Sequence, residues 1–288
     1  MIGRTALLLA SCALGASCAS RPVSPVTLNL KPYVGRLVSV EAEIGGQDTP
    51  MLFDTGAGVT ALTPAAATSL GCEPFGRLVG HRMSGERVDF QRCGDQAIAF
   101  NGYDTLTEAY VFDLMALLPD DLPELGGIVS LASFYGRPFT LDLAGQELII
   151  ETEESLKART KNAKEADLRI KRGVGGDAEI TAFVRIEAEL GDLWFLLDSG
   201  NLDHVAISPH ALYQLGGNPD KASAPEPGDV FDLDIEIAEG IPVSVTARMR
   251  DVIYDGALSE DVMRRFLITF DLANERLWLA RKSVEAPE

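Results

Sequence analysis

An internal repeat constrains the fold of this 288-residue chain more than any other feature of its sequence. Residues 38–45, VSVEAEIG, reappear at 184–191 as VRIEAELG. Both copies alternate apolar and polar residues, which is the pattern of a half-buried strand. Each copy is followed by a turn and by a short apolar strand that runs into an acidic residue. These second segments are MLFDTG at 51–56 and FLLDSG at 195–200, so each half carries one acid at the same point.

The repeat continues at the far end of each half. Residues 127–130, GIVS, are followed by the apolar segments 139–142 and 147–150, and their counterparts are 256–259, GALS, with 268–271 and 276–279. Asp142 and Asp271 begin matching short turns that end in Gly145 and Asn274, residue types that tolerate a positive φ. The two halves therefore share strand order, turn chemistry and the position of one acid.

Short segments with period-two alternation predict an all-β fold with few short helices and two lobes. Helices are expected at 64–70, at 209–215 and in the charged segment 153–166, which we interpret as a solvated connector. The first lobe is expected at 26–164 and the second at 165–283. The region 219–228 is expected to be a proline-rich surface loop.

Composition excludes several partners. The formal net charge of −18 argues against a nucleic-acid partner, because a phosphate backbone requires clustered basic residues. The three histidines, His81, His204 and His210, are scattered, and no Cys/His cluster has metal-ligand spacing. We therefore expect no metal and no cofactor.

The first 17 residues are typical of an export signal, with a basic start and an apolar run at 5–14 that is too short to span a bilayer. Small residues precede Cys18 as in a bacterial lipoprotein cleavage site, which predicts a lipid anchor on that cysteine. Cys12 matches the same pattern but leaves a very short signal, and an ordinary secretory signal is the remaining alternative. Either way the sequence predicts export, as a periplasmic or membrane-anchored protein.

Two further cysteines, Cys72 and Cys93, remain after this segment. In an oxidising compartment they are candidates for one disulfide within the first lobe. The alternative is two independently buried thiols that behave as small apolar side chains.

The two acidic segments resemble the active-site motifs of aspartic peptidases, most closely the bacterial retropepsin-like group with two lobes in one chain. The resemblance covers nearly the whole chain after the signal. It implies that Asp54 and Asp198 are the catalytic pair and that a pseudo-twofold axis brings them face to face. A lone Asp-Thr-Gly would be weak evidence, since an aspartate often only starts a turn, but that alternative does not explain two matching copies.

The resemblance also implies roles for the neighbours of each acid. The glycines Gly56 and Gly200 would let backbone N–H groups approach the carboxylates, and the hydroxyls of Thr55 and Ser199 would hydrogen-bond across the lobe interface. Two carboxylates so close cannot both ionise readily, so one shares its proton while the other activates a water.

A hairpin that folds over the cleft is a further expectation from the family. Residues 78–90 fit it, with Ser84 and Gly85 as a two-residue turn next to Met83 at the tip, and a peptide would lie beneath. The alternative is a plain surface hairpin. No second hairpin of this kind is evident.

Three positions depart from the family pattern. Ser130 and Ser259 replace a customary glycine in both halves, and the proposed flap lacks the tyrosine found in pepsins. In addition, Asn201 follows the second motif in place of a small or hydroxyl residue.

These departures leave three hypotheses. The first is a monomeric endopeptidase acting on exported or envelope proteins. The second is a weak or inactive peptide-binding protein on the same fold. A general degradative hydrolase ranks lowest.

Overall fold

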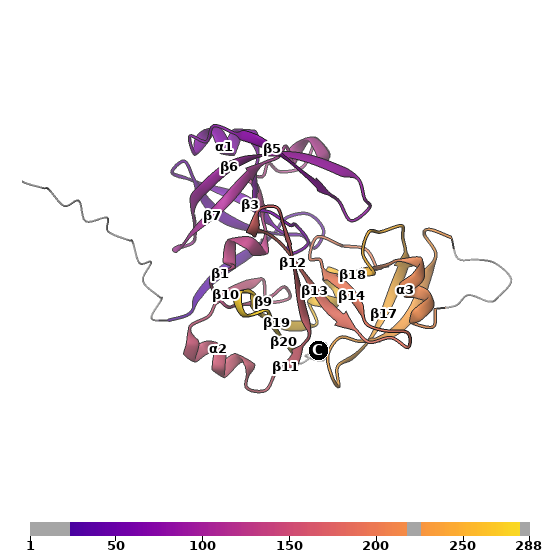
Figure 1. Cartoon of the computed structure of the whole chain (residues 1–288). Coiled ribbons are helices and arrows are strands. Elements are labelled where there is room, and N and C mark those ends of the chain that lie inside the picture. The colour runs from indigo at the N-terminus through magenta and orange to yellow at the C-terminus, as the bar shows by residue number, and fades with distance from the viewer. Residues whose placement is uncertain (1–23, 218–225, 283–288) are drawn as a thin grey trace, which may run out of the picture.

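The computed structural model describes residues 24–217 and 226–282, which form two β lobes that meet in a common sheet (Figure 1). The predicted signal segment 1–17, the predicted lipid-bearing Cys18 and most of the predicted loop at 219–228 lie outside these residues. Among the described residues, the structure contains no helix long and apolar enough to cross a membrane.

The predicted β-rich, two-lobed fold is confirmed, and the described residues include four short α-helices. The first half contains β1 (Val26–Pro32), β2 (Val38–Ile44), β3 (Gln47–Phe53), β4 (Ala61–Leu62), α1 (Pro64–Ser69), β5 (Phe75–His81), β6 (Arg87–Phe100), β7 (Tyr103–Val111), η1 (Met115–Leu117), β8 (Gly127–Val129), η2 (Leu131–Phe134), β9 (Phe139–Asp142), β10 (Glu147–Ile150) and α2 (Glu153–Thr160). The second half contains β11 (Lys164–Ala166), β12 (Leu168–Gly173), β13 (Gly176–Ile186), β14 (Leu193–Leu197), β15 (Val205–Ile207), α3 (Pro209–Gln214), β16 (Val230–Glu236), β17 (Pro242–Met249), β18 (Gly256–Leu258), α4 (Glu260–Met263), β19 (Phe266–Asp271), η3 (Leu272–Asn274) and β20 (Arg276–Arg281).

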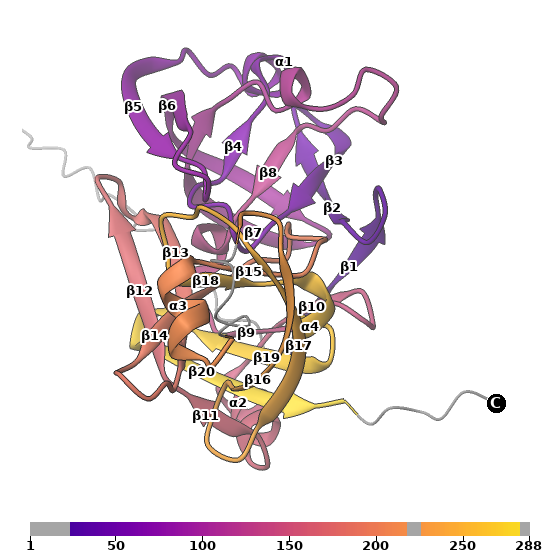
Figure 2. The ribbon, with the colours of Figure 1, turned by 90° about the vertical axis from the view of Figure 1, so that its right-hand side faces the viewer.

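The repeat in the sequence is a repeat of strand pairing. In the first half β2 pairs antiparallel with β3, and β3 pairs parallel with β8. In the second half β13 pairs antiparallel with β14, and β14 pairs parallel with β18. Each acidic motif thus follows a strand that lies between two others in its sheet. Figure 2 shows the second lobe turned toward the viewer, with α3 and β17 in front.

The two halves share one sheet, in the order β11-β20-β19-β9-β10-β1. β9 pairs antiparallel with β19, and Thr140 lies opposite Thr269 in that register. Phe139 stacks on Phe270 at 5.0 Å between ring centroids, so apolar contacts cross the junction. A continuous sheet with a packed core across it fixes one lobe relative to the other.

Local sequence signals place the helices. Thr63 and Ser208 cap α1 and α3 with their side-chain oxygens, and a proline occupies the first position of each helix. The prediction of one helix over 153–166 is wrong in its second half. The helix ends at Thr160, because residues 164–166 pair with β20 as strand β11. The connector is therefore partly built into the common sheet.

The predicted turns after Asp142 and Asp271 form, but with a different residue at positive φ. Gly145 and Asn274 instead donate their N–H groups to the carboxylates of Asp142 and Asp271. The positive φ falls one residue later, on Gln146 (58°) and Glu275 (53°).

Candidate active site

The structure brings Asp54 and Asp198 to the boundary between the lobes, each at the end of a buried strand. Asp54 follows β3 and its N–H donates to the Val129 carbonyl at 3.0 Å. Asp198 follows β14, whose last three residues are buried. Because both strands are hydrogen-bonded on each side, the two carboxylates sit on rigid supports, and both side chains are half-buried rather than sealed from water.

The glycines of the two motifs allow this close approach. Gly56 N–H donates to Asp54 Oδ1 at 2.8 Å, and Gly200 N–H donates to Asp198 Oδ1 at 3.0 Å. A β-carbon at Gly200 would lie 2.8 Å from Asp54 Oδ2, and one at Gly56 would overlap the Asp198 carboxylate. Each carboxylate therefore lies against the loop of the other, so the two are neighbours across the lobe boundary.

Burial raises the pKa of both carboxyls above the usual range for aspartic acid. For Asp54 this is opposed by the N–H groups of Gly56, Gly200 and Ala57 and by a hydrogen bond with Asp198. For Asp198 the negative charge of Asp54 adds to the effect of burial. Two acids that are hydrogen-bonded to each other titrate as one unit that holds a shared proton.

Thr55 and Ser199 connect the two loops, as the family resemblance implies. Thr55 N–H donates to Ser199 Oγ at 3.0 Å, and Ser199 N–H donates to Thr55 Oγ1 at 2.9 Å. The Thr55 hydroxyl in turn donates to the Leu197 carbonyl at 2.7 Å. Both side chains are buried, so these bonds hold the loops in a dry environment where an unmade bond would be costly.

The structure explains two departures from the family pattern. Ser130 is fully buried. Its hydroxyl forms a hydrogen bond with Thr60 and accepts the N–H of Ala132, so it stabilises the interior of the first lobe. Asn201 closes its own loop, because its amide donates to the His204 carbonyl at 3.1 Å and its oxygen accepts the Asp203 N–H. The side chain of Asn201 thus replaces a hydroxyl as the organiser of the second loop.

The predicted flap is the hairpin of β5 and β6, which reaches across to the second lobe (Figure 1). Its turn differs from the prediction of two residues. Arg82 pairs with Glu86 and accepts the Gly85 N–H, so Met83, Ser84 and Gly85 form a three-residue turn. Gly85 has a φ of +81°, which favours glycine at the last position of such a turn.

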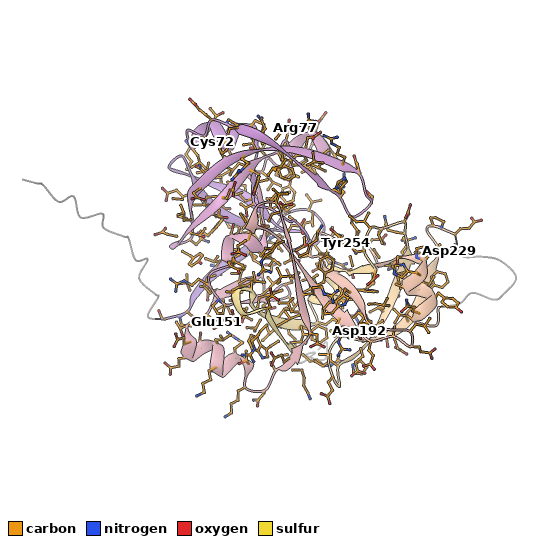
Figure 3. All side chains as sticks on the ribbon, in the orientation of Figure 1. Cys72, Arg77, Glu151, Asp192, Asp229 and Tyr254 are labelled. Atoms are coloured by element: carbon orange, nitrogen blue, oxygen red, sulfur yellow. A yellow bond between two sulfur atoms is a disulfide. The ribbon has the colours of Figure 1, made fainter. Side chains whose placement is uncertain are left out.

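The flap tip contacts the second lobe. Met83 packs against an apolar group that includes Phe183, Leu196 and Ala257, and its carbonyl accepts the Ile253 N–H at 3.0 Å. Figure 3 shows the neighbouring Tyr254 below the hairpin tip, at the margin of the second lobe. The flap tip contacts residues 251–255 of the second lobe. Nothing in the sequence of that segment predicts this contact.

Two apolar clusters adjoin the strands that lead to the acids. Leu52 and Leu196 each lie two residues before an acid, so each shares a strand face with that acid. Leu52 packs with Leu114 and Leu125 in the first lobe, whereas Leu196 packs with Phe183 in the second. Each acid therefore follows a strand that contributes to an apolar cluster in its own lobe.

The predicted disulfide between Cys72 and Cys93 is present, and it joins the segment after α1 to β6. Among the described residues, no group of three or more His, Cys, Asp or Glu side chains is placed to hold a metal ion. A groove of about 600 Å³ lies on the far side of the second loop, lined by Leu202, Asp203 and Arg36 among others, and neither Asp54 nor Asp198 reaches it.

Comparison with known proteins gives a family match for one segment of the chain and similar solved structures for most of it. Residues 40–92 match a family model described as aspartyl protease, a segment that contains Asp54 and most of the flap hairpin. The fold is pepsin-like. The chain is similar to the crystal structure of basic 7S globulin from soybean, with 14% identity and a TM-score of 0.53 over 91% of this chain and 96% of that one.

A second similar structure is conglutin gamma, described as a unique basic 7S globulin from lupine seeds. It shares 10% identity with a TM-score of 0.53, over 90% of this chain and 95% of its own. At such identities the likeness establishes the fold alone. No curated protein sequence matches the chain.

Proposed function

We propose that this chain is an aspartic endopeptidase that hydrolyses peptide bonds with a water activated between Asp54 and Asp198. The observation that carries this proposal is the mutual placement of the two acids, each packed against the glycine of the other motif. The aspartyl protease match over residues 40–92 supports it from an independent direction, since that segment holds the first motif.

The geometry supports different roles for the two carboxylates in the reaction, one as a base and the other as a hydrogen-bond donor. Because the pair holds one shared proton, one carboxylate can accept a proton from water while the other donates a hydrogen bond to the scissile carbonyl. The water attacks the carbonyl carbon, and the proton it loses is later delivered to the leaving nitrogen. The cross-lobe bonds of Thr55 and Ser199 keep the acids at a fixed separation through these steps.

The preferred substrate is an extended peptide with apolar side chains on both sides of the scissile bond. The apolar clusters around Leu52 and Leu196 support this specificity, since they lie on the strand faces that carry the two acids. In this structure Met83 packs on the cluster around Leu196, so the flap must lift before a peptide side chain reaches that cluster.

A second candidate function is peptide binding without turnover. It is favoured by the flap, whose tip is hydrogen-bonded to the second lobe and carries Met83 and Ser84 but no tyrosine. The names of the two similar structures describe seed globulins and mention no catalytic activity. A binder would hold its ligand beside the same two acids and leave it intact.

We also propose that the protein is exported to a bacterial envelope and held there by a lipid on Cys18. The residues around Cys18 and the disulfide in the first lobe support an oxidising compartment. In that location the protein would act as a monomer on exported or envelope proteins.

Cleavage assays on purified protein test the proposed function. Wild type, Asp54→Asn and Asp198→Asn are incubated with a mixed peptide library, and new termini are mapped by mass spectrometry. Asp95→Asn is the matched control, because Asp95 is an exposed carboxylate on β6. We expect cleavage between apolar residues by wild type and Asp95→Asn only. Binding of intact peptides without new termini would favour the second candidate.

A further inference from the structure

Arg36 links the start of the chain to the loop that carries Asp198. It lies in the turn between β1 and β2, in the first half of the sequence, yet its partners belong to the second half. Its Nε lies 2.7 Å from Glu260 Oε2, and one terminal nitrogen donates to the Leu202 carbonyl at 3.3 Å. Gly35, at φ +61°, allows the turn to come this close, since a β-carbon there would lie 3.3 Å from Leu202 Cδ1.

Glu260 holds the same loop from the other side. Its side chain is 1% exposed, and its other oxygen pairs with Arg264 Nε at 2.5 Å. Its backbone N–H donates to the Asn201 carbonyl at 2.9 Å. A carboxylate this deeply buried is stable only when it is paired, so Glu260 and Arg36 hold each other in place. Between them they fix Asn201 and Leu202, which directly follow the Asp198 motif.

In the first half of the molecule, a different kind of interaction holds the equivalent loop. The residue after Ser130 is the apolar Leu131, whereas the residue after Ser259 is Glu260. The loop that follows Asp54 is held by neutral hydroxyls, with Thr60 Oγ1 lying 2.7 Å from Ser133 Oγ. Among the described residues, a charged pair therefore holds the loop after Asp198 and none is seen on the loop after Asp54, which breaks the twofold symmetry of the site.

We propose that Arg36 is a positioning residue, which acts through its ion pair with Glu260 to hold the Asp198 loop against Asp54. This inference rests on the proposed function. Thr55 holds the loop where it starts, at Ser199, and Arg36 holds it three residues later, at Leu202. The loop is thus fixed to the first lobe at both ends, and Asp198 lies beside the first of these contacts.

The decisive variant is Arg36→Gln, which keeps most of the side chain and removes the charge. Arg276→Gln is the matched control, because Arg276 makes a two-bond ion pair with Glu165 on the surface of the common sheet. A displacement of Asp198 by part of an ångström lowers kcat by roughly 10- to 100-fold. We expect that loss with a KM within about twofold of wild type, and wild-type constants for the control.

A second readout does not depend on turnover. Carbon-13 labelling of the aspartate carboxyls allows the two titration steps of the acid pair to be followed by NMR. Because the acids interact, we expect two separate titration steps in wild type, and a loosened loop brings them closer together. We expect a smaller separation in Arg36→Gln and an unchanged one in Arg276→Gln.

The two readouts separate this inference from the proposed function. If wild type cleaves nothing, the proposed function fails, and the titration alone decides the role of Arg36. An unchanged separation, with or without activity, would overturn the positioning role. Glu260→Gln covers the case in which Arg36→Gln does not fold. An amide keeps the shape of the Glu260 side chain but removes the charge that pairs with Arg36, so wild-type kcat and wild-type titration in Glu260→Gln would then overturn the inference.

Discussion

Thr140 Oγ1 lies 2.9 Å from Thr269 Oγ1, and the two threonines occupy the same position in the two halves of the sequence. Equivalent residues that face each other mark a local twofold axis through the common sheet. Thr55 and Ser199 are also equivalent in the repeat, and their backbone and side chains exchange hydrogen bonds in the same reciprocal way. One symmetry relationship thus orders both the joint between the lobes and the pair of acids.

The raised pKa values of Asp54 and Asp198 predict how stability depends on pH. In the unfolded chain both acids have the ordinary value of 3.8, whereas the folded state keeps their protons to higher pH. The folded state therefore binds more protons above pH 3.8, and stability falls as pH rises from there to the raised values.

Asp198→Asn removes this effect, because an amide does not ionise. We expect urea unfolding to show a smaller loss of stability between pH 4 and pH 7 than in wild type. The difference should be about 1.4 kcal/mol for each factor of ten by which folding tightens proton binding at this carboxyl. Asp95→Asn serves as control and should follow wild type. Equal losses of stability in Asp198→Asn and wild type between pH 4 and pH 7 would contradict a raised pKa at Asp198.

Met83→Ala tests whether the flap is held by its contact with the second lobe. Removing the buried part of this side chain weakens the closed state by about 1–2 kcal/mol. The Ile253 amide, which donates to the Met83 carbonyl, should then exchange with solvent roughly tenfold faster. Leu106→Ala, at an exposed side chain of β7, is the control and should leave that amide unchanged. Equal exchange rates in all three proteins would show that Met83 does not hold the flap.

The disulfide predicts a defined loss of stability in the first lobe. Cys72 and Cys93 are 21 residues apart, and opening a loop of that size lowers the free energy of unfolding by about 3 kcal/mol. The double variant Cys72→Ala/Cys93→Ala should show this loss in denaturant unfolding, and reduction of wild type should reproduce it. A loss well below 1 kcal/mol in both would mean that the bond constrains little.

The sequence predicted the parts of the structure that repeat. Strands around Val40 and Val184 were evident because a half-buried strand imposes alternation on its residues. Asp54 and Asp198 were evident because one motif recurs at matching points. Even so, local patterns misplaced the positive φ at Gly145 by one residue, since the neighbouring carboxylate captured that N–H group.

Contacts between distant segments were beyond reach of the sequence. The predicted helix at 153–166 stops early because Ala166 pairs with Leu277 on the last strand. The pairing of Arg36 with Glu260 leaves no periodic trace either. One weak signal of this ion pair was present. Glu260 directly follows the largely apolar segment 256–259, and an acid that is buried with such a segment needs a partner.

The central claim is that Asp54 and Asp198 act as one unit on a tetrahedral centre. A peptide with apolar side chains and a statine-type hydroxyl in place of the scissile bond tests it directly, because such a group mimics the transition state and needs no natural substrate. Binding is measured by calorimetry for wild type, Asp198→Asn and Asp95→Asn, at acid pH and at pH 9.

We predict tight binding at acid pH by wild type and Asp95→Asn, unaffected by EDTA. Binding should weaken at least tenfold in Asp198→Asn, and it should weaken in wild type at pH 9, where the pair loses its shared proton. Equal affinity of wild type and Asp198→Asn at acid pH would contradict the account.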